Sequence, residues 1–157
     1  MRVRIRPILP TDKAALQTGL QRMSPRSRQL RFLQAKLHLT SAELRYLTEV
    51  DGHDHVALVA EQPEASIAAV ARFVRDDRDP TYAESAVTVC DDWQGQGIGT
   101  LLGLALTNEA RAAGVEHLTA IMALDNTAAL RLFRRLSLHL HDEIHDGVRE
   151  LVADLAA

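Results

Sequence analysis

The stretch that decides the fold is Trp93-Gln94-Gly95-Gln96-Gly97-Ile98-Gly99-Thr100-Leu101-Leu102, a glycine-rich turn that opens directly into a helical pattern. Glycine lets the backbone adopt positive φ and come close to a ligand, and the free N–H groups of a first helical turn point at an anion placed there. The stretch therefore predicts either a cradle for a phosphate group or an ordinary bend.

The turn lacks the context of two common phosphate-binding motifs. A dinucleotide-binding fold has its glycines after the first strand and an acidic residue about 20 positions further on. Here the turn lies beyond mid-chain, and no acidic residue stands near that offset at a strand end. A P-loop needs a lysine and a hydroxyl residue after its last glycine, whereas Gly99 is followed only by Thr100.

Composition bounds the rest of the chain. The 157 residues are 46% hydrophobic and 25% charged, which is typical of one globular domain, so we expect a single domain over residues 1–157. The formal charge of −3 and the pI near 6.1 do not favour nucleic acid or an anionic membrane as a partner. One cysteine and an N-terminus without a long apolar run predict a cytoplasmic protein.

Before the turn, the pattern predicts one strand, three short helices and then more strands. Val3–Arg6 alternates apolar and basic residues as a half-buried strand does. The first expected helix runs from Thr11 or Asp12 to Met23. The second is short, begins at Ser24-Pro25 and carries Arg26, Arg28 and Arg31. The third begins with a capping box at Thr40 and ends near Val50. The expected strands are Val56–Glu61, Ser66–Arg75 and Tyr82–Cys90, the first two antiparallel.

After the turn, helices and strands alternate. The expected elements are a helix Thr100–Ala113 ended by Gly114, a strand His117–Leu124, a helix capped by Asp125 or Asn126, and a hairpin of Leu138–Ile144 and Val148–Ala153 around Asp146-Gly147.

Two of these segments together resemble the Gcn5-related N-acetyltransferase (GNAT) family. The match is Gln94-x-x-Gly97-x-Gly99 after a strand, followed by Asp125-Asn126-Thr127-Ala128-Ala129-Leu130-Arg131-Leu132-Phe133-Arg134-Arg135-Leu136, with the opening Ile5–Asp12 and the same order of elements. The resemblance implies an α/β (α+β) fold with a mixed, largely antiparallel sheet, helices on both faces, and a splay between the two central strands.

The resemblance also implies that acetyl-CoA lies in that splay. The backbone N–H groups expected to hold its pyrophosphate belong to Gln94, Gly95, Gln96, Gly97, Ile98, Gly99 and Thr100. The backbone expected to pair with its pantetheine arm, like an added strand, belongs to Val87, Thr88 and Val89. Asn126 would face the pantetheine from the other side, or would serve only as a helix N-cap.

Three further stretches resemble the catalytic domain of actinobacterial protein lysine acetyltransferases of the Pat type. They are Ser24–Arg28, Leu47–Ala60 and Ala83–Gln94. This resemblance implies that Glu84 is the general base, a role the chemistry needs because neutralising a lysine of pKa near 10.4 at pH 7 costs about 4 to 5 kcal/mol. Alternation puts Glu84 on the strand face opposite Val87, and a surface carboxylate is the alternative interpretation. A backbone N–H near Val89 or Cys90 could stabilise the oxyanion.

The sequence departs from the family at Phe133, where many relatives carry a tyrosine thought to protonate the departing thiolate. A phenyl ring cannot donate a proton, so water or Cys90 would have to serve, although Cys90 is also read as a small core residue. The histidines of His53-Asp54-His55 and of His139, His141 and His145 have loosely metal-like spacing, but we expect no metal because nothing completes either set. Arg22, Arg26, Arg28 and Arg31 could contact an anion or form a solvated helix face.

The sequence thus predicts an acetyl-CoA-dependent N-acetyltransferase that moves an acetyl group to a primary amine by direct attack in a ternary complex. A protein lysine is the expected acceptor. The alternatives are a small-molecule amine as acceptor, or a non-catalytic acyl-CoA sensor. A homodimer through an exposed sheet edge is also open.

Overall fold

The computed structural model describes residues 2–26, 39–137 and 139–155. Its α-helices are α1 (Lys13–Arg22), α3 (Ser41–Thr48), α4 (Ile98–Ala112) and α5 (Thr127–Leu136). Its strands are β1 (Arg4–Pro7), β2 (His55–Glu61), β3 (Ile67–Arg75), β4 (Tyr82–Val89), β5 (His117–Ala123), β6 (Leu140–His145) and β7 (Val148–Asp154). Single turns of 3₁₀ helix are η1 (Pro10–Asp12), η2 (Pro63–Ala65) and η3 (Asp91–Trp93).

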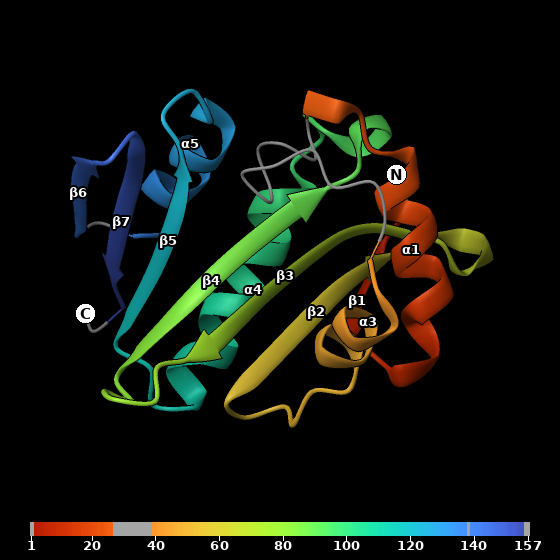
Figure 1. Cartoon of the computed structure of the whole chain (residues 1–157), viewed down its shortest axis with the longest axis horizontal. Helices are drawn as coiled ribbons and strands as arrows, with labels where there is room; N and C mark the ends of the chain where they lie inside the picture. The colour runs from red at the N-terminus through yellow and green to blue at the C-terminus, as the bar shows by residue number, and fades with distance from the viewer. Residues whose placement is uncertain (1, 27–38, 138, 156–157) are drawn as a thin grey trace.

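The strands form one sheet in the order β1-β2-β3-β4-β5-β7-β6 (Figure 1). Every neighbouring pair is antiparallel except β4 and β5, which are parallel and are connected through α4. The last two strands form the expected hairpin, in which Asp146 and Gly147 both have positive φ, as a tight two-residue turn requires.

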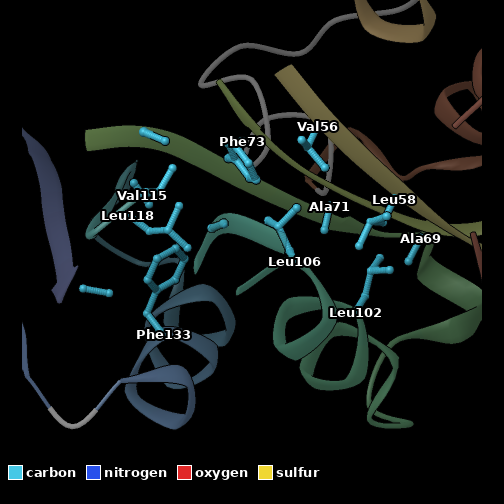
Figure 2. Packing of buried hydrophobic residues seen from close by; sticks show 14 of the residues in the cluster. Val56, Leu58, Ala69, Ala71, Phe73, Leu102, Leu106, Val115, Leu118 and Phe133 are labelled. Atoms are coloured by element: carbon cyan, nitrogen blue, oxygen red, sulfur yellow. The ribbon is translucent and has the colours of Figure 1, made fainter. Parts of the chain in front are cut away.

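The face of the sheet that carries α4 and α5 holds the main core. Phe73 of β3 packs with Leu102 and Leu106 of α4, and Phe133 of α5 packs with Leu118 of β5 (Figure 2). All five side chains are at most 4% exposed. This core fixes α4 beneath the central strands and so fixes the glycine turn that precedes the helix.

Helices α1 and α3 cover the opposite face over β2 and β3. Val59 and Ile67 pack there beside Ile8, while Leu20 and Met23 of the α1 region join a smaller cluster with residues of α3. Since adjacent strand residues point to opposite faces, the apolar runs of β2 and β3 serve both clusters. Both faces of the sheet therefore carry helices, and the predicted fold class is confirmed.

Most predicted elements appear with shifts of one or two residues, and one shift bears on function. Helix α4 begins at Ile98 rather than Thr100 because Gly97, at φ +84°, is its N-cap and Ile98 is already buried. Arg28 and Arg31, predicted on a second helix, lie outside the described residues. Among the described helices, none combines the length and the apolar character that a membrane crossing requires.

Candidate active site

Strands β4 and β5 separate after a short stretch of pairing. Their register contains only Tyr82 with His117, Ala83 with Leu118, and Glu84 with Thr119. Beyond that point β4 continues to Val89 and β5 to Ala123, and the two strands diverge (Figure 1). At the vertex, the Ser85 hydroxyl donates to the Thr119 carbonyl (3.0 Å). The expected splay is present, and Glu84 lies at its closed end.

The edge of β4 that borders the splay presents backbone N–H groups that do not pair with β3. Cys90 N–H donates to Ala68 O of the segment leading into β3 (2.8 Å), and antiparallel pairing alternates, so even-numbered residues of β4 direct their backbone groups toward β3. Val87 and Val89 therefore direct theirs into the splay. Thr88 is bonded toward β3, and its side chain lines the α1 face of the sheet.

The glycine turn presents three further N–H groups at the open end of the splay. The first bond of α4 runs from Leu101 N–H to Gly97 O (3.1 Å), so the N–H groups of Ile98, Gly99 and Thr100 precede it, and no described residue accepts from them. A Cβ built on Gly97 would meet nothing within 4 Å, because the loop is open on that side. The positive φ of Gly95 (+75°) and Gly97 (+84°) is what these positions require of glycine.

Hydrogen bonds made by Gln94 and Gln96 stabilise the turn. Gln94 N–H donates to Asp91 O (3.2 Å), and the Gln94 side-chain amide donates to Val89 O (3.0 Å). The Gln96 side-chain amide donates to Asp92 O (3.2 Å). These bonds tie the loop to the end of β4, so the strand edge and the helix N-terminus form one continuous row of donors.

Asn126 stands on the other side of the splay, at the start of α5. Its side chain accepts from Ala129 N–H (3.2 Å), which is the N-cap bond expected from the sequence. Its neighbour Asp125 pairs with Arg26 (2.8 Å), so the segment after α1 reaches the turn after β5. This bond from Arg26 holds the pKa of the Asp125 carboxyl below its usual range.

Glu84 is exposed and lies on the face of the sheet opposite to α4. Ala86 and Thr88, two and four residues further along β4, line a small pocket of about 60 Å³ under α1 and α3. Val87 and Val89 pack instead against the core cluster that contains α4. The alternation expected from the sequence is therefore present. A molecule that lies between the two strands would meet, at the vertex, a second molecule that approaches Glu84 from the α1 face.

Comparison with known proteins identifies this arrangement. The model of the acetyltransferase (GNAT) family matches residues 20–137. The chain belongs to the GNAT family. Acetyl-CoA is the acetyl donor of this family, and the free N–H row along Val87, Val89 and the start of α4 suits a pantetheine arm and a pyrophosphate.

Relatives place the chain within the family. It is 40% identical over 133 residues to the acetyltransferase Pat of Mycolicibacterium smegmatis, a match that covers 84% of this chain and 40% of that protein, so the chain spans less than half of Pat. The crystal structure of the GNAT domain of S. lividans PAT superposes with a TM-score of 0.89 at 25% identity, covering 97% and 90% of the two chains. An acetyltransferase of Salmonella typhimurium, solved with its cofactor acetyl-CoA, shares the fold at 20% identity (TM-score 0.77, covering 98% and 94%).

The family's tyrosine position holds a ring that is buried in the core. Phe133 is 4% exposed and packs beside Leu118 in the main core (Figure 2). Cys90 is half-buried, and burial together with Asp91 raises its thiol pKa, so it stays protonated at neutral pH. Its N–H already donates to Ala68 O, which excludes Cys90 as the oxyanion donor and leaves Val89 of the two residues suggested by the sequence.

The histidines of the sequence fall into two structural settings. His55 is buried under α3, where its Nε2 lies 3.0 Å from Nη1 of Arg72, and burial lowers its pKa to about 4. His141 and His145 are exposed on β6 and pair with carboxylates of β7. Within the described ranges, no group of three or more histidine, cysteine or acidic side chains has the geometry to hold a metal ion.

Proposed function

We propose that this chain is an N-acetyltransferase that transfers the acetyl group of acetyl-CoA to a protein lysine, with Glu84 as the general base. The observation that carries the proposal is the vertex of the splay. There the pairing of β4 with β5 ends at Glu84 and Thr119, and an exposed carboxylate stands beside the free backbone of β4.

The donor would be held by backbone groups. The N–H groups of Ile98, Gly99 and Thr100 suit the pyrophosphate, because they are unpaired within the described chain and lie at the positive end of a 15-residue helix. The backbone of Val87 and Val89 suits the amides of the pantetheine arm, which would then run beside β4 as a strand does. Asn126 would border that arm from the start of α5.

The reaction is direct attack within a ternary complex. The amine nitrogen forms a bond to the thioester carbonyl carbon, the C–S bond breaks, and CoA leaves as a thiolate. The proton of the amine passes to Glu84, on the face from which the acceptor approaches, and the Val89 N–H is directed into the splay where the carbonyl oxygen would acquire negative charge. Because a thiol has a pKa of only about 8.5, its thiolate leaves without a dedicated acid, which is consistent with Phe133 in the tyrosine position.

The proposal of a protein lysine as acceptor is supported by the relatives of this chain and by the exposure of Glu84. Pat is a relative at 40% identity, and one of the Pat-like stretches of this sequence, Ala83–Gln94, contains Glu84. Glu84 is reached from an open face of the sheet rather than from a closed cavity, which suits a side chain presented by a protein. A small amine would need walls around the carboxylate.

The test is transfer of labelled acetyl groups by the wild type and by Glu84→Gln. With labelled acetyl-CoA and a cell lysate, the wild type should label lysines of one or a few proteins. Glu84→Gln should bind CoA normally but transfer at least about 100-fold more slowly, since loss of a general base costs that much. Glu109→Gln, an equal change on the exposed side of α4, is the matched control and should behave as the wild type.

Other outcomes point elsewhere. Label confined to small molecules would overturn the lysine assignment and favour a small-molecule amine. No CoA release with any protein or amine, despite binding of acetyl-CoA, would favour the non-catalytic sensor. Full activity of Glu84→Gln would remove Glu84 as the base.

A further inference from the structure

The face of the sheet that carries Glu84 continues past the splay over the partly or fully exposed outward residues of β5, β7 and β6. The register places Thr119 beside Glu84, and it places Ile121 of β5 opposite Glu150 of β7, which is in turn opposite Glu143 of β6. Residues opposite one another share a face, so these side chains lie on the face of Glu84. Ile121 is 49% exposed, whereas its neighbours Ala120 and Met122 on the other face are buried.

We name this surface the open face. Its members are the outward residues of three strands beside Glu84, namely His117, Thr119, Ile121 and Ala123 of β5, Val148, Glu150, Val152 and Asp154 of β7, and His141, Glu143 and His145 of β6.

The open face is anionic at neutral pH. With Glu84 it carries the carboxylates of Glu143, Glu150 and Asp154, and no lysine or arginine is among its members. Arg149 of β7 lies on the other face, where it pairs with Asp142. The chain as a whole is only −3, so these four carboxylates make this part of the sheet more acidic than the chain on average. Arg72 of β3 also lies on the face of Glu84, but it is buried under α3.

Histidine side chains contact two of these carboxylates. Asp154 is contacted by His117 through Nδ1 (2.6 Å) and by His141 through Nε2 (3.1 Å), and Glu150 is contacted by His145 (3.2 Å). The contact from His117 holds the pKa of Asp154 below its usual range, so this carboxylate is ionised at neutral pH. Glu143 has no ion-pair partner among the described residues.

We propose that the open face is the docking surface for a segment of the acceptor protein in which lysine or arginine residues flank the target lysine. This inference rests on the proposed function, because it takes Glu84 as the place where the target amine must arrive. Two features support this occupant: the complementary charge, and the continuity of the face with the vertex through Glu84 and Thr119.

The spacing of the strands sets where the flanking charges should lie. Neighbouring strands are about 4.8 Å apart, so β7 and β6 lie roughly 10 and 14 Å from β4, and an extended peptide covers about 3.3 Å per residue. The row of Glu84 crosses Thr119 and Val152, and Glu150 and Glu143 lie two residues further along their strands, so they are roughly 12 and 16 Å from Glu84. A segment running obliquely over the strands with its lysine at Glu84 would bring residues four to five positions away over Glu150 and Glu143. The preference for basic residues should therefore lie mainly on one side of the target lysine.

The test uses two sets of acceptors with acetyl-CoA at saturation. One is a pair of synthetic peptides with a single lysine, in which arginines or glutamates stand four and five residues away, and the other is a peptide digest of a whole proteome with acetylated sites mapped by mass spectrometry. The wild type should acetylate the arginine peptide at least 10-fold faster in kcat/KM than the glutamate peptide. High salt should reduce this ratio, and the mapped sites should be enriched in basic residues at those positions.

Charge reversal of the open face should remove that preference. Glu143→Lys combined with Glu150→Lys should lower kcat/KM for the arginine peptide about 10-fold while leaving the KM for acetyl-CoA unchanged, and the uncharged pair Glu143→Gln and Glu150→Gln should give an intermediate loss. Glu109→Lys on α4 is the matched control. It makes the same kind of charge change on the other side of the sheet and should leave the ratio as it is in the wild type.

The outcomes separate this inference from the proposed function. Acetylation of lysines without a basic preference, or an equal loss in Glu109→Lys, overturns the docking surface and leaves the proposed function standing. Absence of transfer to any lysine in the peptides or the digest overturns the proposed function, and the docking surface falls with it.

Discussion

The buried pair of His55 and Arg72 predicts a specific loss of stability in mild acid. Nη1 of Arg72 donates both to the Leu47 carbonyl (3.0 Å) and to Nε2 of His55 (3.0 Å), and Tyr46 lies over the imidazole with ring centroids 4.9 Å apart. His55 is 9% exposed and Arg72 is 7% exposed. A proton on Nε2 would remove the acceptor that Arg72 uses and place a second positive charge against it in a buried site.

The magnitude follows from the pKa. Burial, together with the charge of Arg72, lowers the pKa of His55 from 6.5 to about 4, so in mild acid the unfolded chain takes up a proton that the folded chain does not. The contribution of neutral His55 to the free energy of unfolding is fully present above pH 6.5 and is lost as the pH falls toward 4. The loss relative to neutral pH is about 2 kcal/mol at pH 5 and approaches about 3 kcal/mol near pH 4.

The measurement compares pH series of urea unfolding for the wild type and His55→Gln. Glutamine can still accept from Arg72 but does not titrate, so this variant should lack the part of the pH dependence that belongs to His55. Trp93 is the only tryptophan of the chain and provides the fluorescence signal. From pH 7 to pH 5, the free energy of unfolding of the wild type should fall by about 2 kcal/mol more than that of His55→Gln, because only the wild type loses this contribution.

His53 provides a matched control, and its result can refute the reasoning. It lies two residues before His55, is exposed, and pairs with Asp54 at 2.9 Å. His53→Gln leaves the buried pair of His55 and Arg72 intact, so this variant should retain the loss of stability that belongs to His55. If His55→Gln kept the wild-type slope between pH 7 and pH 5, protonation of His55 would carry no such penalty, and the burial argument would be wrong.

Three further substitutions should each affect a different part of the fold. Gly97→Ala places a side chain at φ +84°, which costs about 1 to 2 kcal/mol and displaces the N–H groups of the turn, so calorimetry should show acetyl-CoA binding weakened about 10-fold. Asp12→Asn removes the carboxylate that binds Arg6 through two bonds of 2.8 and 2.9 Å, and urea unfolding at pH 7 should show a loss of about 2 kcal/mol that shrinks as the pH falls toward 3. Thr40→Ala removes the capping-box oxygen that accepts from Glu43 N–H, and the same assay should show a loss of about 1 kcal/mol.

The donor side of the site is largely readable from the sequence. Positive φ favours glycine at Gly95 and Gly97, and a Cβ on Gly99 would lie 3.4 Å from the Val89 side chain, so a geometry that suits a pyrophosphate leaves glycines at fixed spacing in the sequence. The start of α4 is harder to predict, since Thr100 resembles an N-cap residue and a glycine cap leaves no hydroxyl as a signal. The helix therefore begins two residues earlier than predicted.

Some contacts on the open face join residues from strands that are far apart in the sequence, so the sequence does not reveal them. His139 and His141 stand out by their spacing, but the partner of His141 is Asp154 on β7, which is shared with His117 on β5. These three residues meet because β7 lies between β5 and β6 in the sheet. A local pattern predicts the hairpin of β6 and β7 but not which of its strands pairs with β5, so the open face could not be assembled from the sequence alone.

The two halves of the reaction therefore differ in how they are encoded. The donor is held by backbone groups, whose positions depend on φ angles and on a helix N-terminus, so a short motif is enough to predict the donor. In our proposal the acceptor meets side chains of four strands, and their charges are free to vary while the fold stays the same, because outward residues of an open sheet face contribute little to the core. If the open face selects the acceptor, members of this family that share the glycine turn but carry lysine at the positions of Glu143 and Glu150 should prefer acidic surroundings of the target amine. Selection of the acceptor would then follow the charge of this face rather than the glycine motif.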